Sequence, residues 1–341
     1  MARDTTFLVQ YGALREGAGL IDRSDRGRLL LTGADRRAYL QGLLTNDIAA
    51  LTPGTGCYSA YLTAQGRMMA DVRTFEMGDA LLADLVGAVA PGVFDRWSQY
   101  VFSEDVTIED LSESTAQIGV YGPAAAEVLE GALAAGRLPG EPTPSAQMLE
   151  SMPVYANSRW NLGAAPVFVL RSDDAGVMGF DVVVTRDRRT ELEDLLRVAG
   201  AVDVGAEAAL ACRIEAGRPL FKVDMTEETI PLEAGIEDRA ISLTKGCYVG
   251  QEIIIRVLHR GQGRVARRLV GLAFDPSAAV PERGERIRAG DREVGTITSA
   301  VQSPALGRPI ALGYVHRDFV EPGTPLIVAG APAVVSALPF V

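Results

Sequence analysis

The residues best suited to chemistry lie in one short run, residues 245–252, which reads Lys-Gly-Cys-Tyr-Val-Gly-Gln-Glu. Cys247 stands two residues after the ammonium of Lys245, and the apolar stretch that follows, residues 253–258, has the spacing of a buried helical face. A helix start and a neighbouring cation both favour a thiolate, so Cys247 could serve as a nucleophile. It could equally be a small buried hydrophobic side chain, as most free cysteines are.

Two further candidates are a carboxylate and an arginine-rich segment. Residues 213–217 read Arg-Ile-Glu-Ala-Gly, and the carboxylate of Glu215 could accept paired N–H donors from a heterocycle. The alternative is an ion-pair cluster at the surface. The segment 256–268, which begins with Arg256, could attract an acidic ligand tail or form an ordinary solvated face.

Composition argues against several classes of protein. The net charge of -11 disfavours direct binding to nucleic acid, because phosphate binding needs clustered cations. Two histidines and three dispersed cysteines, with no Cys-x-x-Cys pair, speak against a zinc site and a disulfide framework. Because the sequence has neither a signal-peptide pattern nor an apolar run of the roughly 20 residues that span a membrane, we expect a cytoplasmic protein.

The elements that must position these residues follow from local patterns. Residues 29–44 and 118–133 share glycines and leucines at the same spacing, and each reads as a strand, a glycine turn (Gly33, Gly122) and a helix. Further strand signals lie at residues 58–62, 71–76 and 80–85. Locally paired strands interleaved with helices predict an α+β fold with antiparallel sheets of the split βαβ type. Residues 136–166 are rich in proline and glycine and predict a long surface connection.

The pattern changes near residue 266. From there short strands alternate with turn residues such as Pro322-Gly323, which is typical of a small barrel or sandwich. We therefore expect one α+β region over residues 1–265 and a separate β domain over residues 266–341.

Several segments resemble the glycine-cleavage T-protein superfamily. They are residues 22–47, residues 65–71, the Arg-x-Glu-x-Gly segment at 213–217 and the final β domain. Within that superfamily, residues 245–252 look like the signature of the YgfZ branch, which is folate-binding and associated with iron–sulfur cluster assembly and tRNA-modifying enzymes. The resemblance covers essentially the whole chain.

The resemblance implies a clover-leaf fold around a central tetrahydrofolate pocket, with two intertwined ferredoxin-like subdomains and a C-terminal β-barrel. Glu215 falls where the family's glutamate meets the pterin ring, and Tyr58 is a candidate aromatic wall for that ring. Asp71 falls near the aspartate that aminomethyltransferases place by the folate nitrogens. Those transferases carry two adjacent aspartates there, whereas this chain has Ala70 before Asp71, and this departure argues against transferase chemistry.

The match at Lys245 and Cys247 suggests a different use of the same pocket. Cys247, activated by Lys245, would handle a one-carbon adduct, a sulfur species or an iron–sulfur intermediate near bound folate, with Arg256 attracting the glutamate tail of the folate. The leading expectation is therefore a tetrahydrofolate-binding accessory protein that supports iron–sulfur enzymes or their assembly factors. Two alternatives stay open: a folate-dependent aminomethyltransferase or demethylase in which Asp71 orients the folate nitrogen, and an interaction scaffold with a vestigial pocket.

Overall fold

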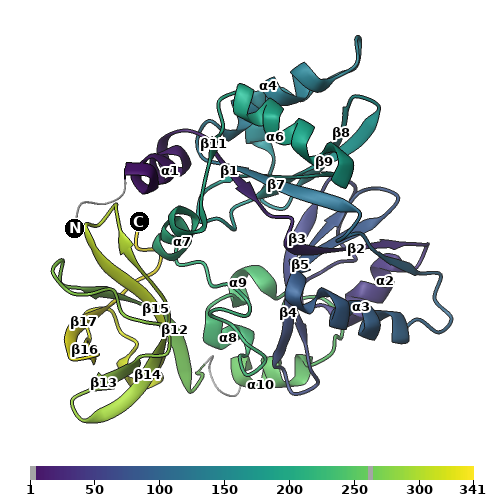
Figure 1. Ribbon diagram of the computed structural model, residues 1–341. Helices are drawn as coiled ribbons and strands as arrows, with labels where there is room; N and C mark the ends of the chain where they lie inside the picture. Colours follow the sequence, from purple (N-terminus) through teal and green to yellow (C-terminus); the bar gives the residue numbers. More distant parts are fainter. Residues whose placement is uncertain (1–4, 260–263) are drawn as a thin grey trace.

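The computed structural model describes residues 5–259 and 264–341 and consists of two open sheets, a closed barrel and connecting helices (Figure 1). Its α-helices are α1 (Thr5–Glu16), α2 (Arg36–Leu43), α3 (Ala90–Gln99), α4 (Ala125–Gly136), α5 (Ala146–Ser151), α6 (Arg189–Val198), α7 (Ala206–Glu215), α8 (Pro231–Ala234), α9 (Glu237–Ala240) and α10 (Gln251–His259). Single 3-10 turns are η1 (Gly87–Val89), η2 (Arg186–Arg188) and η3 (Arg317–Phe319).

A five-stranded antiparallel sheet has the order β3-β4-β5-β2-β6. Its strands are β2 (Arg26–Thr32), β3 (Gly56–Leu62), β4 (Met68–Glu76), β5 (Leu81–Val86) and β6 (Thr107–Asp110). Apolar residues on one face, including Leu29, Leu31 and Val72, pack against Leu40 of α2 and Trp97 of α3. The opposite face carries the charged residues Asp71, Arg73 and Asp84 together with apolar residues such as Leu62 and Phe75.

A six-stranded sheet has the order β11-β1-β7-β10-β9-β8. Its strands are β1 (Gly19–Asp22), β7 (Thr115–Tyr121), β8 (Asn157–Leu162), β9 (Ala165–Ser172), β10 (Gly179–Thr185) and β11 (Val202–Asp203). Helices α4 and α6 cover one face, with Leu129 and Leu192 packed on Ile118 and Val182. The predicted surface connection at 136–166 is wrong in part, because α5 and the edge strand β8 form within it.

The two sheets are intertwined, since the consecutive strands β1 and β2 belong to different sheets. The predicted strand–glycine–helix repeats appear once in each sheet, as β2 to α2 and β7 to α4. Gly33 and Gly122 both have positive φ, at 100° and 122°. A Cβ on Gly33 would lie 2.0 Å from the backbone oxygen of Asp105, so only glycine fits this turn.

The C-terminal strands close into a barrel with the order β12-β15-β14-β13-β16-β17. They are β12 (Arg267–Phe274), β13 (Arg286–Ala289), β14 (Arg292–Ser303), β15 (Arg308–His316), β16 (Pro325–Val328) and β17 (Ala331–Ser336). The barrel has its own core and packs against α1 and α7 (Figure 1). The predicted α+β fold with a C-terminal β-barrel is confirmed. No helix within the described residues has the length and apolar character needed to cross a membrane.

Candidate functional site

A central cavity of about 630 Å³ lies where α7, α9 and the inner edges of both sheets meet. Its wall comes from several parts of the chain that are far apart in sequence. The charged and tyrosine residues of this lining are Asp22, Arg23, Asp25, Arg26, Tyr58, Asp71, Asp174, Arg213, Arg218, Lys222 and Arg239. The cavity therefore combines these polar groups with a largely apolar lining, which includes residues of α7 and of the loop that follows it.

Asp71 and Tyr58 project into this cavity from neighbouring strands. Asp71 on β4 is paired with Ala60 on β3, which puts it diagonally across from Tyr58 on the same face. The Tyr58 hydroxyl donates to Oδ2 of Asp71 at 3.0 Å. Oδ1 of Asp71 is buried and has no hydrogen-bond partner among the described residues. Burial raises the pKa of Asp71. A buried carboxylate with one free oxygen is suited to accept a ligand N–H or a proton.

Arg239 on α9 covers the ring of Tyr58. Its guanidinium carbon lies 4.3 Å from the ring centroid, within the range of a cation–π contact. Tyr155 stacks beside Tyr58 with the ring centroids 6.2 Å apart. The orientation of Tyr58 is thus fixed by Asp71, by Arg239 and by Tyr155.

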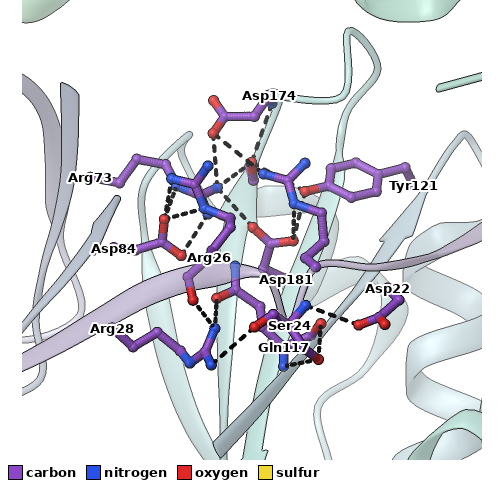
Figure 2. Close-up of polar contacts among 12 residues, drawn as sticks. Asp22, Ser24, Arg26, Arg28, Arg73, Asp84, Gln117, Tyr121, Asp174 and Asp181 are labelled. Atoms are coloured by element: carbon purple, nitrogen blue, oxygen red, sulfur yellow. Dashed lines mark hydrogen bonds and ion pairs between the residues drawn. The ribbon is translucent and has the colours of Figure 1, made fainter. Parts of the chain in front are cut away.

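A buried ion-pair network supports the cavity wall. Figure 2 shows Arg73 among three carboxylates: Asp84 at 2.8 Å, Asp181 at 2.7 Å and Asp174 at 3.1 Å. Burial acts to raise the pKa of Asp84, but the charges of Arg26 and Arg73 outweigh it and hold that pKa well below the usual range. Asp174 and Arg26 are members of the network that also line the cavity, so the network fixes part of the wall in position.

Glu215 does not line the central cavity. It lies on α7, where Oε2 accepts from the Tyr11 hydroxyl at 2.7 Å, and Oε1 accepts from the Ser303 hydroxyl and the Ala305 backbone N–H. Both oxygens are therefore occupied at the junction of α1, α7 and the barrel. These contacts do not support the predicted contact of Glu215 with a pterin ring, because the side chain faces the barrel rather than the cavity.

Lys245 also lies outside the cavity. Its Nζ donates to the backbone oxygens of Gln41 at 2.7 Å, Leu44 at 2.6 Å and Asn46 at 2.8 Å. Burial lowers the pKa of Lys245 to about 8, so the ammonium form still predominates at neutral pH. All three ammonium protons are engaged at the C-terminal end of α2, an interaction that suits the helix dipole.

Cys247 and Arg256 complete the predicted site residues. Cys247 is exposed, and α10 begins only at Gln251, so the thiol does not stand in the first turn of that helix. With its protons used elsewhere, Lys245 has none to donate to Cys247, and the predicted activation finds no support in these contacts. Arg256 is exposed and pairs with Glu252 one turn earlier, outside the cavity lining. Residues 260–263 of the arginine-rich segment lie outside the described residues.

The structure thus brings together Tyr58 and Asp71 and separates them from Glu215, Lys245, Cys247 and Arg256. It adds Arg239 and Asp174, which sequence reasoning missed. Arg239 sits in a short helix with no motif around it, so the sequence carried no signal for its position. Asp174 lies in a turn after β9, and its pairing with Arg73 depends on contact between the two sheets.

Two known domain families match this chain. Residues 5–245 match the GCVT N-terminal domain, and residues 267–341 match the glycine cleavage T-protein C-terminal barrel domain. The chain therefore belongs to the glycine cleavage T-protein family. An aminomethyltransferase of Thermosynechococcus vestitus is 31% identical over 340 residues, which is 98% of this chain and 88% of the relative. One of Saccharopolyspora erythraea is 30% identical, covering 99% and 90% of the two chains.

A solved structure agrees on the fold. The glycine cleavage system aminomethyltransferase T of Bartonella henselae superposes with a TM-score of 0.84 at 24% identity, covering 98% of this chain and 89% of that one. The curated relatives match along nearly the full length and are named aminomethyltransferases. The expected accessory role for iron–sulfur enzymes is therefore wrong, and the relatives favour the alternative that we left open, the folate-dependent transferase.

Proposed function

We propose that this protein is a tetrahydrofolate-dependent one-carbon transferase of the aminomethyltransferase type. The observation that carries the proposal is the free, buried Oδ1 of Asp71 in a cavity that is large enough for a folate head group. An unsatisfied buried carboxylate oxygen is costly, and a ligand N–H removes that cost. The names of the full-length relatives support the same class of reaction.

The residues present fit the reduced pterin ring system. Asp71 offers an acceptor for a ring N–H, and the Tyr58 hydroxyl that bonds to it belongs to the cavity lining. Tetrahydrofolate would supply the nitrogen that receives the one-carbon unit. Asp71 would hold that nitrogen through its N–H and accept its proton as the nitrogen bonds to the one-carbon unit, while the donor's bond to that carbon breaks and the electron pair leaves with the donor group. A raised carboxyl pKa suits this proton transfer. Tyr58, by donating to Oδ2, keeps Oδ1 directed at the ligand.

We also propose that the chain belongs to the YgfZ branch of this family, because residues 245–252 resemble the signature of that branch. Lys245 and Cys247 have no role in the transfer step as we propose it, since neither lines the cavity.

The test is transfer from an aminomethylated carrier protein to tetrahydrofolate by the purified protein. We expect Asp71→Asn to lower the turnover rate by about 10²- to 10⁴-fold, because a positioned general base contributes that much, with a smaller change in the Kd for tetrahydrofolate. The control is Asp25→Asn, a change at an exposed carboxylate that also lines the cavity. Wild-type turnover by Asp71→Asn would remove the proposed role of Asp71, and a wild-type protein that neither binds tetrahydrofolate nor turns over would remove the function.

A further inference from the structure

Arg239 differs from every other described cation that lines the central cavity. Arg26 and Arg213 pair with Asp84 and Asp224, and the remaining pairs are Arg23 with Asp174 and Asp181, Arg218 with Asp173, and Lys222 with Glu227. No carboxylate of the described residues lies within 4.0 Å of the Arg239 guanidinium.

The hydrogen-bonding capacity of Arg239 is also incompletely used. Its Nη1 atom is buried and has no hydrogen-bond partner among the described residues. The contact with Tyr58 engages the flat face of the guanidinium system and leaves N–H groups at its edge available. A buried charged donor without an acceptor is unfavourable, so the protein holds this group in an arrangement that an anionic ligand would complete.

The acidic residues near Arg239 do not supply the missing acceptor. Asp173 and Asp174 act on Arg239 only at longer range, since Asp173 pairs with Arg218 and Asp174 with Arg73. Asp71 contacts the hydroxyl end of Tyr58, whereas Arg239 lies over the ring itself. A free acceptor and a free donor of opposite charge are therefore offered across a single tyrosine ring, in the same cavity.

We propose that Arg239 binds a carboxylate of the ligand in this cavity and so selects a carboxylate-bearing substrate. A planar guanidinium with free edge N–H groups matches the two oxygens of a carboxylate. The inference rests on the proposed function in taking the cavity as the site of the transfer reaction. Two sources offer this chemistry, the glutamate carboxylates of the folate and the carboxylate of a small amino-acid donor, and the ligand's N–H would then face Asp71.

The experiment measures binding of four probes by titration calorimetry: tetrahydrofolate, tetrahydropteroate (which lacks the glutamate), N-methylglycine, and dimethylamine (which lacks the carboxylate). The variants are Arg239→Gln and Arg239→Lys, each checked for folding by circular dichroism. The matched control is Arg256→Gln, because Arg256 is an exposed arginine outside the cavity lining.

We expect Arg239→Gln to weaken one carboxylate-bearing probe by about 10- to 100-fold, as loss of a charge-assisted hydrogen bond does, and to leave the matching probe without a carboxylate unchanged. Arg239→Lys should retain part of the affinity, and Arg256→Gln all of it. Selective loss of affinity for tetrahydrofolate identifies the folate carboxylate as the partner of Arg239. Selective loss of affinity for N-methylglycine identifies the carboxylate of the amino-acid donor as that partner.

Equal affinity of wild type and Arg239→Gln for all four probes would overturn the inference. If tetrahydrofolate still bound the wild type and turnover still depended on Asp71, the proposed function would stand without it. Absence of tetrahydrofolate binding by the wild type would instead overturn the proposed function, so the two failures are distinguishable.

Discussion

The side chain of Lys245 satisfies three backbone oxygens that the end of a helix leaves open. Gln41, Leu44 and Asn46 supply those oxygens, all at or just beyond the end of α2. Cys247, two residues further on, is exposed at the surface. The two most distinctive residues of the sequence therefore have different positions in the structure, one buried as a helix cap and one at the surface.

At this scale we predict a difference between two substitutions. Lys245→Met removes the donor from three carbonyls and should lower the free energy of unfolding by about 2 kcal/mol, because buried acceptors are left unpaired. Cys247→Ala, the matched control, should change it by less than about 0.5 kcal/mol, as surface substitutions usually do. Urea denaturation measures both. Equal stabilities of the two variants would contradict the capping role of Lys245.

Helix α7 joins the cavity to the barrel. Its residues Ala206 and Arg213 line the cavity, whereas Glu215 at its C-terminal end bonds to Tyr11 and to Ser303 of β14. The same short helix therefore carries residues with two different tasks, because successive side chains point to different sides.

We predict that Glu215→Gln weakens the attachment of the barrel without affecting the site. The amide nitrogen of glutamine is itself a donor and would lie against the groups that donate to Glu215. The free energy of unfolding should therefore fall by about 1–3 kcal/mol. The Kd for tetrahydrofolate should change by less than about twofold, since Glu215 lies outside the cavity lining. Glu207→Gln, an exposed change on the same helix, is the control. A large rise in Kd with unchanged stability would instead restore the predicted pterin contact.

At the scale of the whole molecule, the buried network ties the two sheets together. Arg73 and Asp84 belong to the five-stranded sheet and Asp181 to the six-stranded sheet (Figure 2). Burial opposes ionisation of Asp84 and Asp174, but the neighbouring arginines outweigh it, so the pKa of each is lowered. A lowered carboxyl pKa contributes stability that is complete above the unfolded pKa of about 3.9 and is lost as the pH falls through the folded pKa.

We therefore predict acid sensitivity that depends on this network. The free energy of unfolding of the wild type should fall as the pH drops below about 4. Asp84→Asn should lower the free energy of unfolding by about 3–5 kcal/mol at pH 7, because it leaves buried arginines without a counter-charge. The difference in unfolding free energy between wild type and variant should become smaller in acid. Denaturant titrations at pH 7, 5 and 3 measure this. Parallel pH curves for the two proteins would rule out a stabilising role for the ionised Asp84.

Features that depend on local pattern can be predicted from the residues alone. The α+β class, the C-terminal barrel and the paired strand–glycine–helix units follow from residue periodicity and from glycines such as Gly33, whose backbone angle no other residue adopts easily. The resemblance of short motifs brought Tyr58 and Asp71 into consideration. Their meeting in one cavity follows from the register of β3 and β4.

The directions of the other candidate side chains depend on contacts between distant segments. Glu215 turns to the barrel, Lys245 turns to α2, and Arg239 turns to Tyr58, each through contacts between segments that are far apart in the chain. Spacing within one segment holds no information on which distant segment packs against it. The chemical role of a charged side chain depends on that neighbour, because the neighbour sets its burial, its partners and its pKa.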